Sequence, residues 1–234
     1  MSPPTIAIAI LAAVCWFAMI WRHAAGEHFA SGPTPSTLAD DFLGWIVMAG
    51  AMMLPTTLPA VDDVMRRSYR RRRWISAMEY VVGYMLCWEI VGAMFVLLRL
   101  HPMMHDRHLV VLGCLLAGLW VVFPVRRIWF AQCHRQIPLC PTGWRADWDA
   151  IRQGVTQGVP CVKMCWLLMV ACGISGHDWV MMMGGTALAV CEKRMFRLNR
   201  APIAIGSLTL AAWFLAQIAL QHNQHIPAQS HLHH

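Results

Sequence analysis

Long apolar runs recur along the whole chain, and they restrict its fold more than any other feature. Hydrophobic types make up 58% of the 234 residues and charged types only 13%, whereas soluble domains carry about 25% charged residues. A water-soluble monomer, a disordered chain, a coiled coil and a disulfide-rich secreted scaffold are therefore excluded. The runs lack strand alternation, so we predict an all-α, polytopic transmembrane helical bundle.

The apolar runs predict about seven membrane spans within a bundle of residues 1–221. A helix needs about 20 residues to cross the hydrocarbon, or about 17 at the short end. The sixth run is shorter than this, so it is a tilted span or a re-entrant segment. The first run follows Met1-Ser2-Pro3-Pro4, which lacks a basic side chain, and we expect a retained span rather than a signal peptide. The predicted spans lie near residues 5–21, 42–61, 79–98, 108–125, 159–175, 179–191 and 202–220.

Basic residues predict how the bundle is oriented. Most of them fall in the connections 66–73, 126–152 and 193–200, which seven spans place on one side. The positive-inside rule makes that side cytoplasmic, with the N-terminus in and the C-terminus out of a bacterial inner membrane. The surplus of positive charge then faces anionic lipid headgroups. The basic run has few interleaved aromatic residues, so we expect no nucleic-acid partner.

Histidines are distributed in the opposite way. On this topology all of them except His134 face outward, and several lie in a His-rich periplasmic tail, residues 222–234. Neutral imidazole is the commonest protein ligand for zinc and copper(II), so these residues could capture metal ions. Alternatively, outward loops simply carry polar residues.

The fifth predicted span carries a column of sulfur atoms. Cys161 and Cys165 are four residues apart, Met169 continues the same helix face, and Cys172 extends it. Pro160 suits the first turn of this helix. Thiolate and thioether donors select Cu(I) or zinc over magnesium and calcium. The alternative is that small residues pack between helices here.

Two methionines of the second predicted span form a second sulfur cluster. Met48 and Met52 share a face, and Pro55 and Pro59 follow them. The two prolines interrupt the backbone hydrogen bonds inside the membrane, and broken helices often mark binding sites. The alternative is a methionine-filled core with a kink.

Glu89 lies near the middle of the third predicted span. An ionisable group at that depth costs about 2.5 kcal/mol or more, so it is a candidate functional residue with Cys87 or a metal as its partner. The alternative is a protonated glutamate with a structural hydrogen bond. No nucleophile–base arrangement or phosphate-binding glycine loop occurs, and the adjacent Cys133 and His134 do not form a catalytic dyad by spacing alone.

Several motifs between residues 42 and 195 resemble a bacterial family of predicted metal-binding integral membrane proteins of unknown function. The resemblance implies a metal site. This chain departs from the pattern at Gln157, where relatives carry histidine, and Glu89 is not part of it. The matching residues are Trp45-Ile46-Val47-Met48, Ala51-Met52-Met53-Leu54-Pro55, Pro59, Gly83-Tyr84, Trp88, Cys133-His134-Arg135, Pro138-Leu139, Pro141, Gly143-Trp144-Arg145-Ala146-Asp147, Gly154, Gly158, Cys161, Cys165-Trp166, Met169 and Glu192-Lys193.

These observations predict an inner-membrane protein that binds a soft metal ion, copper or otherwise zinc, for handling, delivery or export. We expect ligand exchange and no chemical reaction. The alternative is a membrane subunit or assembly factor of a larger complex, with no metal of its own and a protein partner on the connection 126–152. A redox enzyme that uses the thiols is a third reading. The predicted metal ligands are Cys161, Cys165, Met169, Met48, Met52, Cys172 and Glu89.

Overall fold

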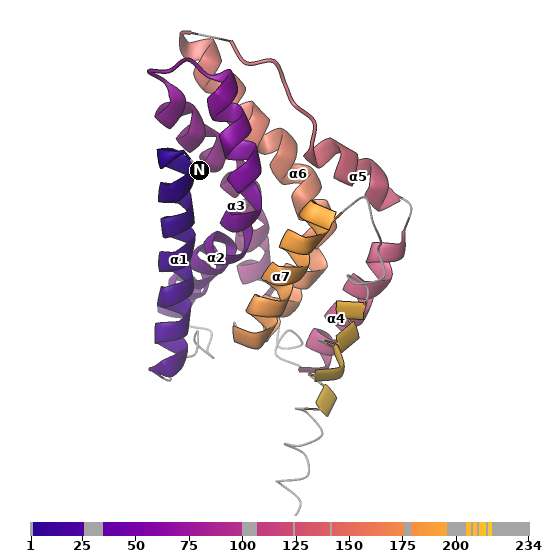
Figure 1. Ribbon diagram of the computed structural model, residues 1–234. Coiled ribbons are helices and arrows are strands. Elements are labelled where there is room, and N and C mark those ends of the chain that lie inside the picture. Colours follow the sequence, from indigo (N-terminus) through magenta and orange to yellow (C-terminus); the bar gives the residue numbers. More distant parts are fainter. Residues whose placement is uncertain are drawn as a thin grey trace, which may run out of the picture.

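The computed structural model describes residues 2–25, 35–99, 107–123, 125–140, 142–175 and 179–195, with short pieces between 205 and 216. Within these ranges the chain is helical and has no strand, which confirms the all-α prediction (Figure 1). The helices are α1 (Pro3–Ala24), α2 (Pro35–Arg67), α3 (Arg73–Arg99), α4 (Arg107–Val122), α5 (Val125–Cys133), α6 (Trp144–Ile174) and α7 (Trp179–Met195).

Four of the described helices are long and apolar enough to cross a membrane. These segments are Pro3–Arg22, Leu38–Arg67, Arg73–Leu98 and Trp144–Ile174. Helices α4 and α7 contain 16 and 17 residues, which is at or below the length of a short span. The predicted last span, 202–220, lies mostly outside the described residues, as does the tail 222–234. Seven spans and their orientation therefore stay predictions.

Helix α6 is longer than the sequence pattern indicates. It begins at Trp144, fifteen residues before the predicted start at 159, so Pro160 lies inside the helix and not in its first turn. The added N-terminal half is polar, and hydropathy does not detect it. Two of its glutamines are nevertheless buried and bonded: Gln153 donates to Arg135 O at 2.9 Å and accepts from Ile137 N at 2.7 Å. The short helix α5 was also not predicted, because it falls in a connection rich in arginine.

Helices α3 and α6 run parallel and form the most extensive helix pair of the described chain. Three glycines allow their backbones to approach. A Cβ at Gly83 would lie 2.2 Å from Ile151 O, and one at Gly154 would lie 2.1 Å from Tyr80 O. A Cβ at Gly158 would lie 2.9 Å from the Cys87 thiol. Close packing of small residues is the usual way in which helices associate in a membrane.

Helix α2 crosses behind this pair and is held to α3 by an indole hydrogen bond. Trp45 Nε1 donates to Trp88 O at 3.0 Å, and the Trp45 ring packs on Phe95 with ring centroids 5.1 Å apart. Helix α7 packs against α2 and α6, as Figure 1 shows. The main hydrophobic core lies between these helices, and most of its sulfur atoms come from α2 and α6.

Candidate metal-binding site

The sulfur column of α6 faces the interior of the bundle. Cys161 is 1% exposed, Cys165 6%, and Met169 and Cys172 0%. The neighbouring Trp166, in contrast, is exposed. The spacing at i, i+4 and i+8 therefore predicted the correct face of the helix, and the thiols do not point outward.

Cys161 and Cys165 interact directly through a side-chain hydrogen bond. The Cys161 thiol also accepts a hydrogen bond from Tyr84 Oη of α3 at 2.9 Å. Tyr84 Oη lies 3.3 Å from Thr56 Oγ1 of α2, so the hydroxyl links the thiol to a second helix. The packing of α3 on α6 through their glycines places this tyrosine opposite the thiol.

Lys193 of α7 brings a positive charge to the same place. Its Nζ donates to Thr56 Oγ1 at 2.8 Å and lies 3.4 Å from Tyr84 Oη. The ammonium group interacts electrostatically with Cys161, Cys165 and Cys133. A cation beside thiols favours the thiolate form, which is the form that binds metal ions. The sequence indicated an interfacial position for this lysine, so its role beside the thiols was missed.

The methionines of α2 belong to the same core as the thiol pair. Met48 and Met52 are fully buried. The Met52 Cε atom and the Leu168 side chain of α6 meet over Gly185 of α7, where a Cβ would lie 2.8 Å from Cε and 3.4 Å from Leu168 Cδ2. Met52 of α2 and Leu168 of α6 therefore meet at the surface of α7.

Cys172 and Glu89 were also predicted as metal ligands. The Cys172 thiol donates to Met181 O of α7 at 3.7 Å, which ties it to the backbone. Glu89 is half-buried, and its Oε2 atom is buried without a hydrogen-bond partner. Its predicted partner Cys87 is directed toward Gly83 O at 3.5 Å and Val155 O at 3.9 Å. The role of Glu89 as a metal ligand therefore stays a prediction.

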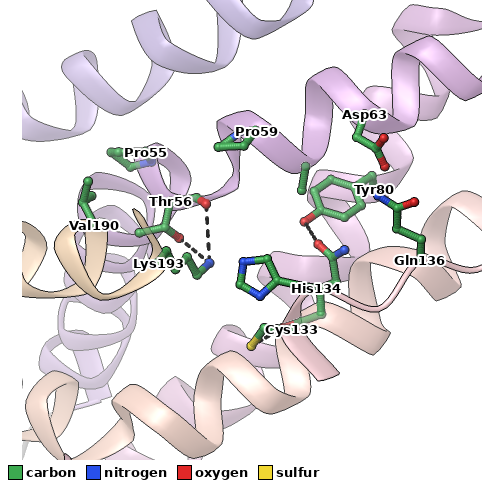
Figure 2. Close-up of a pocket in the computed structure, with 12 residues that line it drawn as sticks. Pro55, Thr56, Pro59, Asp63, Tyr80, Cys133, His134, Gln136, Val190 and Lys193 are labelled. Atoms are coloured by element: carbon green, nitrogen blue, oxygen red, sulfur yellow. Dashed lines mark hydrogen bonds between the residues drawn. The ribbon is translucent and has the colours of Figure 1, made fainter. Parts of the chain in front are cut away.

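A cavity of about 280 Å³ lies beside the thiol pair, and Figure 2 shows the side chains around it. The two prolines of α2 form part of its wall, but the helix continues through both of them and is not interrupted there. The adjacent Cys133 and His134 both line it, although their spacing alone gave no reason to pair them. Its lining residues are Pro55, Thr56, Pro59, Ala60, Asp63, Tyr80, Cys133, His134, Gln136, Gln157, Val190 and Lys193.

Gln157 is held in the wall of this cavity. Its Oε1 accepts a hydrogen bond from Tyr80 Oη at 2.6 Å, and its Nε2 lies 3.4 Å from Arg135 O. The amide thus satisfies a buried hydroxyl and a loop carbonyl. The histidines predicted to face outward lie outside the described residues or side chains.

The donor chemistry of the site fits a soft ion. Among the described ranges, no three side chains of histidine, cysteine, aspartate or glutamate are close enough together to hold a metal ion. Two neighbouring thiols with thioethers in the same core, however, match the ligand preference of Cu(I). The predicted thioether donors Met169 and Met52 are buried in the same core as Cys161 and Cys165.

The fold and the site define the class of protein. It is helical, four of its described helices are long and apolar enough to cross a membrane, and its core is rich in sulfur atoms. The chain belongs to the PpoB2 family, described as copper chaperone, which matches residues 42–216. The matched residues include every sulfur donor of α2 and α6 described above. No curated protein and no solved structure was found to match the chain.

Proposed function

We propose that the protein is a membrane-embedded copper chaperone that holds Cu(I) between the Cys161 and Cys165 thiolates. The thioether of Met169 completes the coordination, and Met52 and Met48 of α2 receive the ion as it leaves or arrives. Exchange between thiolate and thioether donors moves the ion without a change in its oxidation state. Zinc has the same preference for thiolates but a weaker one for thioethers, so copper fits this donor set better.

The observation that carries this proposal is the buried, hydrogen-bonded thiol pair beside a lysine ammonium group. A buried thiol that only fills space in the core is neutral and behaves as a small apolar side chain. Such a thiol does not require a cation beside it. The ammonium group of Lys193 balances the charge of a bound thiolate, and so does Cu(I) itself. The family description, copper chaperone, agrees with this assignment.

We further propose that the chain lies in a bacterial inner membrane with its basic connections inside. Four helices of sufficient length and the concentration of arginine at 66–73 support this placement. Delivery of copper to a periplasmic acceptor, or its export, is then the role of the site.

The decisive experiment measures copper retained by purified protein in detergent after treatment with a Cu(I) chelator. Mutation of the residues that hydrogen-bond to metal ligands typically lowers metal affinity about 10- to 100-fold. Removal of two ligands has a larger effect, so the double variant Cys161→Ser/Cys165→Ser should bind copper about 100-fold more weakly or worse. Cys114→Ser is the matched control, because Cys114 is fully buried in the same core but belongs to α4. Cys191→Ser controls for an exposed thiol.

Thermal unfolding of each variant shows whether the fold survives the substitutions. Copper held at the wild-type level by a folded double variant would show that the site is wrong. Wild-type protein that retains no copper, while a stable protein partner co-purifies with it, would favour a subunit of a larger complex.

A further inference from the structure

We call the proposed Cu(I) site of Cys161, Cys165 and Met169 the retention site, and the cavity of about 280 Å³ beside it the chamber. The side chains that line the chamber include donors that the retention site does not use. Cys133 is the last residue of α5, and His134 follows in the turn. Both line the cavity, although they are neighbours in sequence, because the helix ends between them. The Cys133 thiol is buried and lies 3.9 Å from Gln157 O, whereas His134 is exposed. A thiol and an imidazole thus border one chamber, and Figure 2 shows the His134 ring directed toward Lys193 with Cys133 beside it.

Two successive hydrogen bonds through Tyr84 link the wall of the chamber to the retention site. Thr56 and Lys193 form part of its wall, and Tyr84 lies directly behind them. The Tyr84 hydroxyl in turn donates to the Cys161 thiol at 2.9 Å. An ion in the chamber is therefore separated from Cys161 by this layer of polar side chains and not by a layer of packed apolar residues.

The Lys193 ammonium group occupies the boundary between the two sets of thiols. It interacts electrostatically with Cys133 on the chamber side and with Cys161 and Cys165 on the far side. It is fixed to Thr56 by hydrogen bonds to Oγ1 at 2.8 Å and to the carbonyl oxygen at 3.5 Å. A cuprous ion that crosses this boundary must displace a positive charge from the same place.

We propose that this chamber is a second Cu(I) site, an exchange site in which His134 and Cys133 bind the ion in transit before Cys161 and Cys165 take it over. This proposal rests on the proposed function and names the route by which the retention site is filled and emptied. Lys193 is a positioning residue that covers the route, and it does not bind the ion.

The test follows the transfer of Cu(I) from the loaded full-length protein to the chelator bicinchoninate in a stopped-flow spectrometer. The variant Cys133→Ser/His134→Gln should retain as much copper as wild type at equilibrium, because the retention site is intact. Its transfer should be about tenfold slower, because the ion loses its intermediate ligands and the barrier rises. Cys140→Ser is the matched control, since this exposed thiol follows in the same connection but does not line the chamber.

The outcomes separate this inference from the function on which it rests. Unchanged transfer in a folded Cys133→Ser/His134→Gln variant that retains copper would overturn the exchange site and leave the retention site standing. Equal loss of retained copper in that variant would also overturn it, because the two residues would then belong to the retention site. Failure of wild-type protein to bind copper would overturn the proposed function itself.

A measurement on the unaltered protein makes the test independent of any folding defect. Alkylation of each cysteine is followed by mass spectrometry as Cu(I) is added. The first equivalent should protect Cys161 and Cys165, and copper beyond it should protect Cys133 while Cys191 stays reactive. Cys133 that remains unprotected with copper in excess would overturn the exchange site.

The Lys193→Met variant tests the boundary. It keeps the length and apolar stem of the side chain but removes the charge, so transfer of Cu(I) to the chelator should become faster, whereas Cys161 should be alkylated more slowly because no cation favours its thiolate form. Transfer at the wild-type rate with unchanged alkylation of Cys161 would overturn the covering role of the lysine.

Discussion

Substitution of Gly154 by alanine tests whether the α3–α6 contact positions the metal site. The added Cβ would lie 2.1 Å from Tyr80 O and 2.8 Å from Tyr84 N, whereas carbon atoms in contact prefer about 3.5 Å or more. Both neighbours are backbone atoms, which cannot rotate away. The two helices must therefore separate, and because Tyr84 moves with α3, its hydrogen bond to Cys161 lengthens as they do.

The expected cost follows from the size of this overlap. Overpacking of a tight interface costs about 1–3 kcal/mol, while replacement of a helical glycine by alanine returns up to about 1 kcal/mol. With about 2–4 °C per kcal/mol for a chain of this length, Gly154→Ala should lower the Tm by a few degrees. It should also weaken the retention of copper.

Gly113→Ala is the matched control for this prediction. Its Cβ would meet the Ala171 side chain at 3.1 Å, so a small shift accommodates it. We expect its Tm to stay at the wild-type value or rise slightly, through the gain in helix propensity. Thermal unfolding in detergent, followed by circular dichroism, measures both variants. A Gly154→Ala protein with the Tm and copper content of wild type would refute the reasoning.

Two further predictions concern single hydrogen bonds. Tyr84→Phe removes the hydroxyl that donates to Cys161, so we expect a loss of about 1 kcal/mol in the free energy of unfolding and, because that hydrogen bond stabilises the thiolate, slower alkylation of Cys161; unchanged alkylation would contradict this. In the exposed loop, the hydrogen bond with Asp149 raises the pKa of Cys140. Asp149→Asn should lower that pKa, so the thiol should be alkylated faster at mildly alkaline pH, with no difference once the pH exceeds both values. Equal rates at every pH would exclude this role of the carboxylate.

The helical architecture and the inward face of α6 could be predicted because both depend on local periodicity. Four-residue spacing places Cys161 and Cys165 on one helix face whatever the surroundings, and apolar neighbours on both sides make that face the buried one. The run Met181-Met182-Met183 follows the same rule. The first two side chains are buried and Met183 is exposed, as expected for residues that cannot all share one face.

The start of α6 could not be predicted from hydropathy. Its first half carries charges that face outward, while Gln153 and Gln157 are buried with hydrogen-bond partners from the preceding connection and, for Gln157, from Tyr80 of α3. A hydropathy window averages these two faces and finds no apolar helix. The charged positions are compatible with a helix that rises above the apolar layer.

The cavity could not be predicted because it is assembled from five helices and a connection, most of which are distant in sequence. Lys193 stands near the end of an apolar segment, where a solvent-exposed cation is the usual expectation, and only the approach of α7 to α2 brings it to Thr56. Likewise, Cys133 and His134 come to face one space because α5 ends between them. The positions of these side chains around the cavity depend on how the helices pack, which residue spacing does not specify.

The hydrogen bonds around the chamber are distributed unequally, and this has a mechanical consequence. On one side Gln153 and Gln157 fasten the 135–137 connection to α6 at several points. On the other side, Lys193 joins α7 to Thr56 of α2 through its ammonium group. Widening of the chamber along the seam between α2 and α7 therefore requires that this side chain release Thr56.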